Sequence, residues 1–254
     1  MARIIAIANQ KGGVGKTTTA VNLAASLAAA EKRTLLVDLD PQANATSGIG
    51  INSRNAQQTV YHALLGSASA DSVRQATNLE QLHLLPANPD LIGAEVELIS
   101  ALARESKLKT ALKEIANEYD YILIDCPPSL GLLTINALTA ADAVLIPLQC
   151  EYYAMEGLSQ LVNTIRLIQK ELNPNLFIRG ILLTMFDSRN NLSHQVSEEI
   201  RKHFSEQVFQ TIIPRNVRLS EAPSHGLPAL LYDISSSGAT AYLDLAREII
   251  RTEH

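Results

Sequence analysis

The chain has 254 residues, 46% of them hydrophobic but only 4% aromatic, and it contains no tryptophan. A chain of this length can bury a core without a disulfide or a structural metal, so we expect a single domain over residues 1–254. The formal net charge of −5 argues against a uniformly basic nucleic-acid coat protein, so any contact with DNA should be local. No apolar run approaches the ~20 residues that span a bilayer, so we expect a cytoplasmic protein.

The first predicted elements are a strand and a helix joined by a glycine-rich loop. Residues 3–8 (RIIAIA) are typical of a buried strand, residues 10–19 read QKGGVGKTTT, and a helical pattern begins near Thr18. Gly12, Gly13 and Gly15 have no β-carbon, so successive N–H groups of the loop can point at phosphate oxygens. The helix start adds the positive end of its dipole. This arrangement predicts a P-loop.

Two polar side chains complete the predicted phosphate site. Lys16 is placed to reach the β- and γ-phosphates of ATP, and the Thr17 hydroxyl is placed to coordinate Mg²⁺. A glycine turn flanked by solvated lysines is the plainer interpretation, but the strand before the loop and the helix after it favour the P-loop. The predicted nucleotide-binding residues of this segment are Lys11, Gly12, Gly13, Val14, Gly15, Lys16, Thr17 and Thr18.

The second predicted strand, residues 34–39 (TLLVDL), brings two acids toward the P-loop. Pro41 ends the strand and leaves Asp40 at the carboxyl edge of the sheet. An Asp before Pro is also a common turn residue, so this interpretation depends on the neighbouring P-loop. Residues 44–58, rich in Gly, Ser and Asn, predict a mobile loop next to the nucleotide.

A third acid follows the predicted strand at residues 119–125 (YDYILID). Before it we expect short helical pieces at 59–65 and 72–76, a strand at 81–86 and a longer helical pattern at 91–118. Apolar residues followed by Asp125 form a Walker B arrangement, which can hold a Mg²⁺-bound water. Many parallel strands end in Asp, so this signal gains its weight from the P-loop upstream. The predicted magnesium-site residues are Thr17, Asp40 and Asp125.

Alternating strands and helices continue to the end of the chain. We expect strands at 144–148, 177–185 and 208–213, and helices at 153–172 and 239–251, the last of which should pack on the domain. The last two strands should end at the sheet edge that carries the P-loop, where an adenine would lie. The alternation, with the P-loop after the first strand, predicts a doubly wound α/β fold with a mostly parallel sheet flanked by helices.

One departure from the strict pattern GxxxxGK[ST] is informative. The pattern needs a glycine where this chain has Gln10, and a second lysine, Lys11, lies inside the loop. The string KGGVGKTTT resembles the deviant Walker A motif of the ParA/Soj/MinD group of ATPases, and the strings DLDPQ at 38–42 and DCPPS at 125–129 resemble further motifs of the ParA/Soj family. By this resemblance, which covers nearly the whole chain, Lys11 reaches the nucleotide of a second subunit, Lys16 is the ordinary Walker lysine and Asp40 positions the attacking water.

The resemblance also implies a function, an ATPase with weak intrinsic activity that partitions DNA. ATP would join two subunits into a sandwich dimer that binds DNA without sequence preference and associates with the nucleoid, and hydrolysis stimulated by a ParB-like partner would release it. Lys11 would supply the cation that many P-loop enzymes take from an arginine finger. The family's base-lining positions would be Met185, Pro214, Arg215 and Asn216, and its DNA-contacting positions Arg189 and Arg218.

Local charge gives limited support to the DNA interpretation. Between residues 201 and 218 there are four Lys or Arg residues and one acid, Glu206. A dimer doubles such a patch, so an acidic monomer can still bind phosphates. A small basic excess is, however, more often only solvated charge.

Three alternatives remain open at this point. A MinD-like membrane ATPase would need a basic amphipathic C-terminal helix with bulky apolar residues, whereas this chain ends IIRTEH. A metabolic P-loop enzyme would need an acceptor pocket, which the sequence does not reveal. Relatives such as the nitrogenase iron protein hold an iron–sulfur cluster with two cysteines from each subunit, but Cys126 and Cys150 lack the glycine-rich flanks of that branch, and buried inert thiols are the default.

Overall fold

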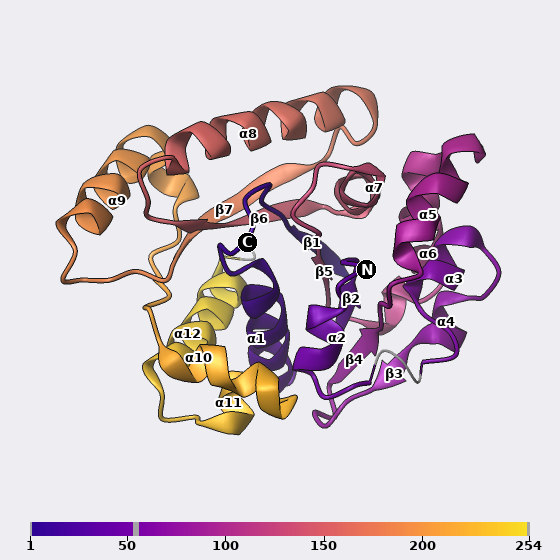
Figure 1. Ribbon diagram of the computed structural model, residues 1–254, viewed down its shortest axis with the longest axis horizontal. Helices are drawn as coiled ribbons and strands as arrows, with labels where there is room; N and C mark the ends of the chain where they lie inside the picture. The colour runs from indigo at the N-terminus through magenta and orange to yellow at the C-terminus, as the bar shows by residue number, and fades with distance from the viewer. Residues whose placement is uncertain (1, 53–55, 253–254) are drawn as a thin grey trace.

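The computed structural model of this protein describes residues 2–52 and 56–252, and these form layers around one central sheet (Figure 1). Within these residues the sheet has seven strands in the order β3-β4-β2-β5-β1-β6-β7. All neighbouring strands are parallel except β3 and β4. The strands are β1 (Arg3–Ile7), β2 (Thr34–Asp38), β3 (Gln75–Ala76), β4 (Leu82–Leu85), β5 (Tyr121–Asp125), β6 (Ala143–Gln149) and β7 (Phe177–Thr184).

Helices cover both faces of the sheet, with α1 and α12 on one face and α7 and α8 on the other (Figure 1). The α-helices are α1 (Lys16–Ala29), α2 (Asn44–Gly48), α3 (Val60–Leu65), α4 (Ala70–Val73), α5 (Leu91–Glu97), α6 (Lys107–Lys113), α7 (Leu132–Ala140), α8 (Ala154–Glu171), α9 (Asn191–Phe204), α10 (Val217–Glu221), α11 (Ala229–Tyr232) and α12 (Ser237–Arg251). Short 3₁₀ turns are η1 (Leu98–Ser100), η2 (Arg104–Ser106), η3 (Ala116–Glu118), η4 (Ser205–Gln207) and η5 (Ala222–His225). The predicted doubly wound α/β fold is therefore confirmed.

The two faces of the sheet carry two separate apolar cores. Because successive side chains of a strand point to opposite faces, Ile5 and Ile7 of β1 pack with the side chains of α1 and α12, whereas Ala6 packs with those of α7 and α8. Both sides of the central strands are thus buried, which explains why these strands are nearly continuous apolar runs. The apolar stripe of α12, which includes Tyr242 and Ile249, is buried, so this helix packs on the domain as predicted.

The parallel register brings the functional ends of three strands together. Ile7, the last residue of β1, lies beside Asp125 at the end of β5, and Asp125 in turn lies beside Asp38 at the end of β2. The P-loop follows β1 at the same edge. From β1 the chain crosses to β2 on one side of β1, and later strands return to place β6 on its other side. The site therefore sits at a switch point of the sheet, at the carboxyl ends of its strands.

Several predicted elements near the site were wrong. The segment 44–58, predicted as a mobile loop, contains helix α2, because Ala45 and Thr46 are buried and Thr46 bonds to β2; residues 53–55 lie outside the described residues. The predicted strand at 208–213 forms no ladder: Val208 makes an isolated bridge to Ile181 of β7, and Pro214, just after the segment, makes one to Phe186, beyond the end of β7. Glu248 accepts the backbone N–H groups of 210 and 211, so these groups cannot join a ladder.

Other boundaries also differ from the predictions. The predicted helical segment 91–118 is broken into α5, α6 and three 3₁₀ turns, with a left-handed residue, Ala103 (φ 51°), at the break. The predicted helical piece at 72–76 ends at Val73, and residues 75–76 form the antiparallel edge strand β3. Helices α7 and α9 were not predicted. α7 is buried almost all round, so its apolar residues show no helical periodicity.

Candidate functional site

The P-loop is shaped by two left-handed glycines and anchored by long-range hydrogen bonds. Gly13 (φ 76°) and Gly15 (φ 86°) adopt a conformation that other residues rarely tolerate. Asn9 Oδ1 accepts from the N–H of residue 11 at 3.0 Å, and Asn9 Nδ2 donates to the Pro147 carbonyl at 2.7 Å. The Thr184 hydroxyl donates to the carbonyl of residue 14 at 2.8 Å. The loop is thus held at the ends of β6 and β7.

The two lysines of the loop have different environments. Lys16 is only 7% exposed, and its Nζ donates to the carbonyl of Lys11 at 3.0 Å. Burial lowers the pKa of Lys16, although Asp125 and Asp40 act in the opposite direction. The Lys11 side chain is 45% exposed and forms an ion pair with Glu151, which follows β6. Lys16 therefore lies inside the site, and Lys11 lies at its rim.

The side chain of Gln10 holds the start of the loop against α8. Its Nε2 donates to Gln160 Oε1 at 2.8 Å and to the Gly157 carbonyl at 3.2 Å. Position 10, which holds glycine in the strict pattern, is therefore used here to tie the loop to a helix. The start of the P-loop is therefore anchored by the side chains of both Gln10 and Lys11.

Two fully buried carboxylates lie side by side beneath the loop. Asp38 accepts hydrogen bonds from Thr46 N at 2.8 Å, Thr46 Oγ1 at 2.7 Å and Asp40 N at 3.1 Å. Burial nevertheless raises the pKa of Asp38 to about 6. Neither oxygen of Asp125 has a hydrogen-bond partner among the residues described. Burial first, and then the neighbouring Asp38, raise the pKa of Asp125 well above its ordinary value, although the nearby Thr17 hydroxyl and Lys16 act in the opposite direction.

An unpartnered buried carboxylate is the feature that fits Mg²⁺. Such a group is costly to bury, and a divalent cation or its waters would satisfy it. Asp40, 8% exposed, and Thr17 lie at the same end of the sheet. In the described part of the chain no three His, Cys, Asp or Glu side chains are grouped so that they could hold a metal alone. Mg²⁺ does not need such a cage, because it keeps several waters and takes further ligands from phosphates.

A cavity of about 580 Å³ opens above the P-loop, and it brings together most of the predicted site residues. The predicted residues that line it are Gly12, Gly13, Gly15, Lys16, Thr17, Thr18, Asp40, Met185, Pro214, Arg215 and Asn216. Further lining residues that were not predicted are Gln42, Asn44, Pro128, Thr184, Ile213, Leu219, Ser220, Pro223 and Tyr242. Of these, Pro128 belongs to the DCPPS string, so a sequence signal existed for it.

The two predicted base-side loops are adjacent. An isolated bridge joins Phe186 to Pro214, so the loop after β7 lies against the segment 214–216. Met185 has φ 48°, an uncommon conformation for a residue with a side chain. Asn216 caps the start of α10 by accepting from the N–H groups of residues 218 and 219 at 2.9 and 3.3 Å.

Five predicted residues do not line the cavity, and the first of them, Lys11, lies at its rim. Val14 and Asp125 are buried beneath the loop, 1% and 0% exposed. The Arg189 side chain is 86% exposed and forms a bidentate ion pair with the Asp187 carboxylate, with two N–O distances of 3.0 Å. This pairing lowers the pKa of Asp187 to about 2.

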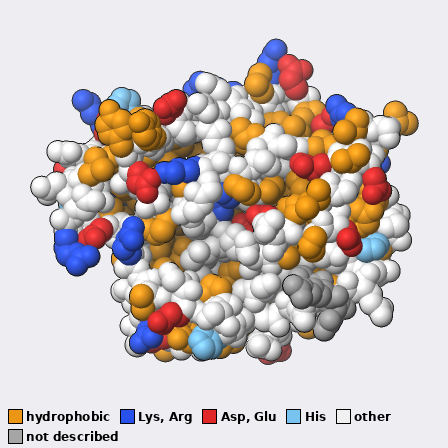
Figure 2. Space-filling view, viewed as in Figure 1, with side chains coloured by type: hydrophobic (Ala, Val, Ile, Leu, Met, Phe, Trp, Pro, Cys, Tyr) orange, Lys and Arg blue, Asp and Glu red, His pale blue; other side chains and the backbone are white. Residues whose placement is uncertain are grey.

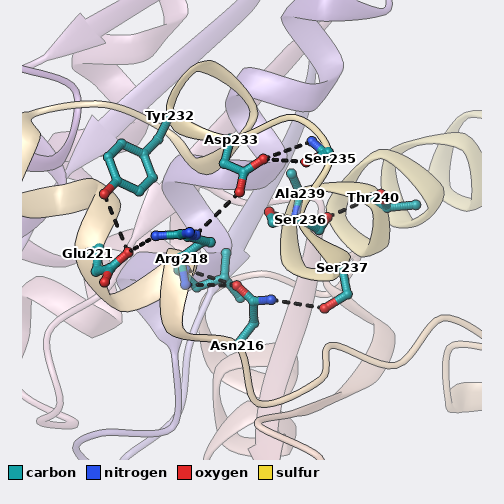
Figure 3. Close-up of polar contacts among 11 residues, drawn as sticks. Asn216, Arg218, Glu221, Tyr232, Asp233, Ser235, Ser236, Ser237, Ala239 and Thr240 are labelled. Carbon is teal, nitrogen blue, oxygen red and sulfur yellow. Dashed lines mark hydrogen bonds and ion pairs between the residues drawn. The ribbon is translucent and has the colours of Figure 1, made fainter.

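Arg218, the fifth, is on α10 and lies between the carboxylates of Glu221, on the same helix, and Asp233, which follows α11 (Figure 3). On the face seen in Figure 2, basic and acidic side chains are interspersed rather than gathered in one basic patch.

Both cysteines are buried thiols. Cys126 is 1% exposed and Cys150 5% exposed. Burial raises the pKa of both, that of Cys150 to about 11. Cluster ligation requires the thiolate, so these environments suit inert thiols.

A glycine loop at the start of a helix, with a buried lysine in the loop and a buried carboxylate beneath it, defines a P-loop nucleotide-binding protein. The family model described as an AAA domain matches residues 2–178. The chromosome partitioning protein ParA of Myxococcus xanthus is 62% identical over 251 residues, which cover 99% of this chain and 89% of that protein. The sporulation initiation inhibitor protein Soj of Bacillus subtilis is 61% identical over 249 residues, which cover 98% of each chain.

A solved structure shares the same fold at lower identity. The structure of cobyrinic acid a,c-diamide synthase from Mycobacterium smegmatis with bound ADP and magnesium is 40% identical, with a TM-score of 0.87 over 99% of this chain and 95% of that chain. The two relatives above, more than 60% identical over almost the whole chain, show that the chain belongs to the ParA/Soj family. It is a P-loop ATPase, and ATP and Mg²⁺ are its cofactors.

Proposed function

We propose that this protein is a DNA-partitioning ATPase that works as an ATP-dependent dimer. ATP joins two copies face to face, the dimer binds DNA without sequence preference in the cytoplasm, on the nucleoid, and hydrolysis releases it. A ParB-like protein stimulates that hydrolysis. The names of the two curated relatives, which are more than 60% identical over almost the whole chain, support this proposal.

The position of Lys11 is the observation that carries the proposal. The cavity already has one buried lysine, Lys16, to neutralise phosphate charge. Lys11 lies in the same loop, yet its half-exposed side chain turns to Glu151 at the rim. Because Lys11 turns away from the cavity of its own subunit, it can reach the nucleotide bound by a facing subunit. There it would stabilise the charge that develops on the γ-phosphate.

The remaining residues have distinct roles in hydrolysis. The loop amides and Lys16 hold the phosphates, and Thr17 and Asp125 hold the hydrated cation. Asp40 orients the attacking water from the edge of the cavity, where Gln42 N donates to its carboxylate at 2.9 Å. Mg²⁺, when bound, neutralises phosphate charge. Because a second subunit supplies Lys11 as the additional cation for the charge that develops on the γ-phosphate, hydrolysis depends on dimerisation.

The decisive experiment measures both dimerisation and DNA retention with ATP, with ADP and without nucleotide. Random-sequence duplex DNA is titrated at two salt concentrations, and mass is followed by sedimentation. The Asp40→Ala variant should accumulate as an ATP-bound dimer that retains DNA. Retention should weaken steeply with salt, as phosphate contacts predict.

A matched pair of variants tests where the DNA lies. Arg189→Ala should weaken binding, whereas Lys170→Ala, which removes a similarly exposed cation at the far end of α8, should not. A protein that dimerises with ATP but ignores DNA, or that retains DNA equally with every nucleotide, would refute the proposal. Addition of a ParB-like protein should raise the ATP turnover of the wild type but not that of the Asp40→Ala variant.

Two alternatives have their own tests. Across residues 2–52 and 56–252 no helix is long and apolar enough to cross a membrane. The apolar stripe of α12 is buried on the domain, so this helix does not present an apolar face to a membrane surface. ATP-dependent sedimentation with anionic liposomes would favour the membrane alternative. The M. smegmatis neighbour carries the name of a synthase, and ATP turnover stimulated by an acceptor carboxylic acid would favour such a metabolic role here.

A further inference from the structure

Arg218 does not present a free positive charge. Its Nη1 lies 2.7 Å from Glu221 Oε2, and its Nε lies 3.3 Å from Asp233 Oδ2 (Figure 3). Glu221 is one turn along the same helix, α10, whereas Asp233 follows α11. One cation and two anions leave this group with a net charge of −1. As it stands in the structure, this surface would repel a phosphate.

Both carboxylates are held by other residues as well. The Tyr232 hydroxyl donates to Glu221 Oε2 at 3.3 Å, and the Tyr232 ring stacks on His225 with centroids 4.9 Å apart. Ser235 donates to Asp233 Oδ1 twice, from its hydroxyl at 2.6 Å and from its backbone N–H at 3.1 Å. An incidental surface pair has no such support. Both acids are therefore held by contacts other than those with the arginine.

The same arginine is tied to the nucleotide cavity through the backbone. Its N–H donates to Asn216 Oδ1 at 2.9 Å, and Asn216 lines that cavity. Asn216 Nδ2 in turn donates to Ser237 Oγ at 2.9 Å, at the start of α12. The start of α10 is thus shared between the nucleotide cavity and the acidic group around Arg218.

We propose that Glu221 and Asp233 form a carboxylate clamp that sequesters Arg218 and competes with DNA phosphates for it. This inference rests on the proposed DNA-binding function and adds a regulatory element to it. The Arg218 side chain is 46% exposed, so each ion pair is weak enough to be exchanged for a phosphate. The clamp lowers the affinity for DNA, because a phosphate must displace a carboxylate before it can bind Arg218.

A double-mutant cycle tests the clamp in full-length protein carrying Asp40→Ala, with ATP present. Glu221→Gln keeps an acceptor for Tyr232 but removes the charge, and Asp233→Asn does the same for Ser235. Each should tighten binding of a random-sequence duplex by about twofold to fivefold, the range that an exposed ion pair covers. In an Arg218→Gln background the same substitutions should have no effect, because the clamped group is absent.

A matched control separates the clamp from the general electrostatic field. Asp244→Asn removes a carboxylate from α12 that pairs with Arg247 at 2.8 Å in the same i,i+3 geometry. It should leave DNA affinity unchanged, and all variants should keep their melting temperatures.

Three outcomes overturn the clamp. Equal tightening with and without Arg218 would assign the effect to overall charge, and no tightening in the Arg218 protein would show that the acids do not compete. If the protein with its clamp residues unaltered binds no DNA with ATP, both the proposed function and the clamp fail. If the protein binds DNA with ATP but the substitutions of Glu221 and Asp233 have the same effect with and without Arg218, only the clamp fails.

Discussion

Replacing Asp125 by asparagine should stabilise the nucleotide-free protein while weakening its response to Mg²⁺ and ATP. The side chain is 0% exposed, and neither oxygen has a hydrogen-bond partner in the described part of the chain. Asn has nearly the same shape but no charge. The substitution therefore removes the part of the burial cost that comes from ionisation, a gain of about 1–3 kcal/mol. For a chain of this length each kcal/mol corresponds to roughly 2–4 °C in Tm.

In the presence of Mg²⁺ and ATP, the same substitution should reduce the stabilisation that these ligands give to the folded protein. A ligand present at about 100 times its Kd stabilises the folded state by about 2.7 kcal/mol. Asp125 is the buried acid that would hold the hydrated cation, so Asp125→Asn should lose most of the Mg²⁺-dependent part of this stabilisation. Thermal unfolding in EDTA and in Mg²⁺ with ATP measures both effects in one series.

Asp38 provides the matched control for this prediction. It is equally buried and lies beside Asp125 in the sheet, but it accepts three hydrogen bonds. Asp38→Asn should therefore destabilise the nucleotide-free protein by about 1–3 kcal/mol, because an amide cannot accept all three. If Asp125→Asn lowers the Tm in EDTA as Asp38→Asn does, Asp125 is structural and the reasoning is wrong. An undiminished gain from Mg²⁺ and ATP would also refute it.

Three further predictions test other parts of the site and fold. Lys11→Ala should lower dimer-dependent ATP turnover on the order of 100-fold, while the Kd for a fluorescent ATP analogue should change by no more than about threefold. If turnover and nucleotide affinity fell equally, Lys11 would not act on the nucleotide of the other subunit. Gly180→Ala should cost about 1–3 kcal/mol in urea unfolding because its β-carbon would lie 2.6 Å from the Phe209 ring, whereas Gly93→Ala on α5 should be neutral or stabilising. Burial and Arg74 lower the pKa of His83, outweighing Glu118, so the wild type should lose stability relative to the His83→Gln variant as pH drops through 6.5, a comparison in which the opposite contributions of Asp38 and Asp125 cancel.

Local patterns in the sequence determined the chemistry of the nucleotide site. The spacing of Gly13, Gly15 and Lys16 specifies a phosphate loop because backbone conformation and helix start are local properties. Acids that end buried strands, such as Asp125, are equally visible, since the carboxyl ends of parallel strands meet at one edge. The resemblance of residues 11–19 to a deviant Walker A motif then identified the family, which the comparisons confirm.

Tertiary structure alone decided which partners these groups have. Glu151, the partner of Lys11, lies 140 positions away, and only the register of β2 and β5 sets Asp38 beside Asp125. Counting charges between residues 201 and 218 predicts a basic surface, whereas Asp233, outside that window, helps to make the surroundings of Arg218 acidic. Periodicity reports which face of an element is buried, but it carries no information about which distant side chain meets it. The nucleotide site can therefore be predicted from the sequence, whereas the ion pairs that hold Lys11 and Arg218 cannot.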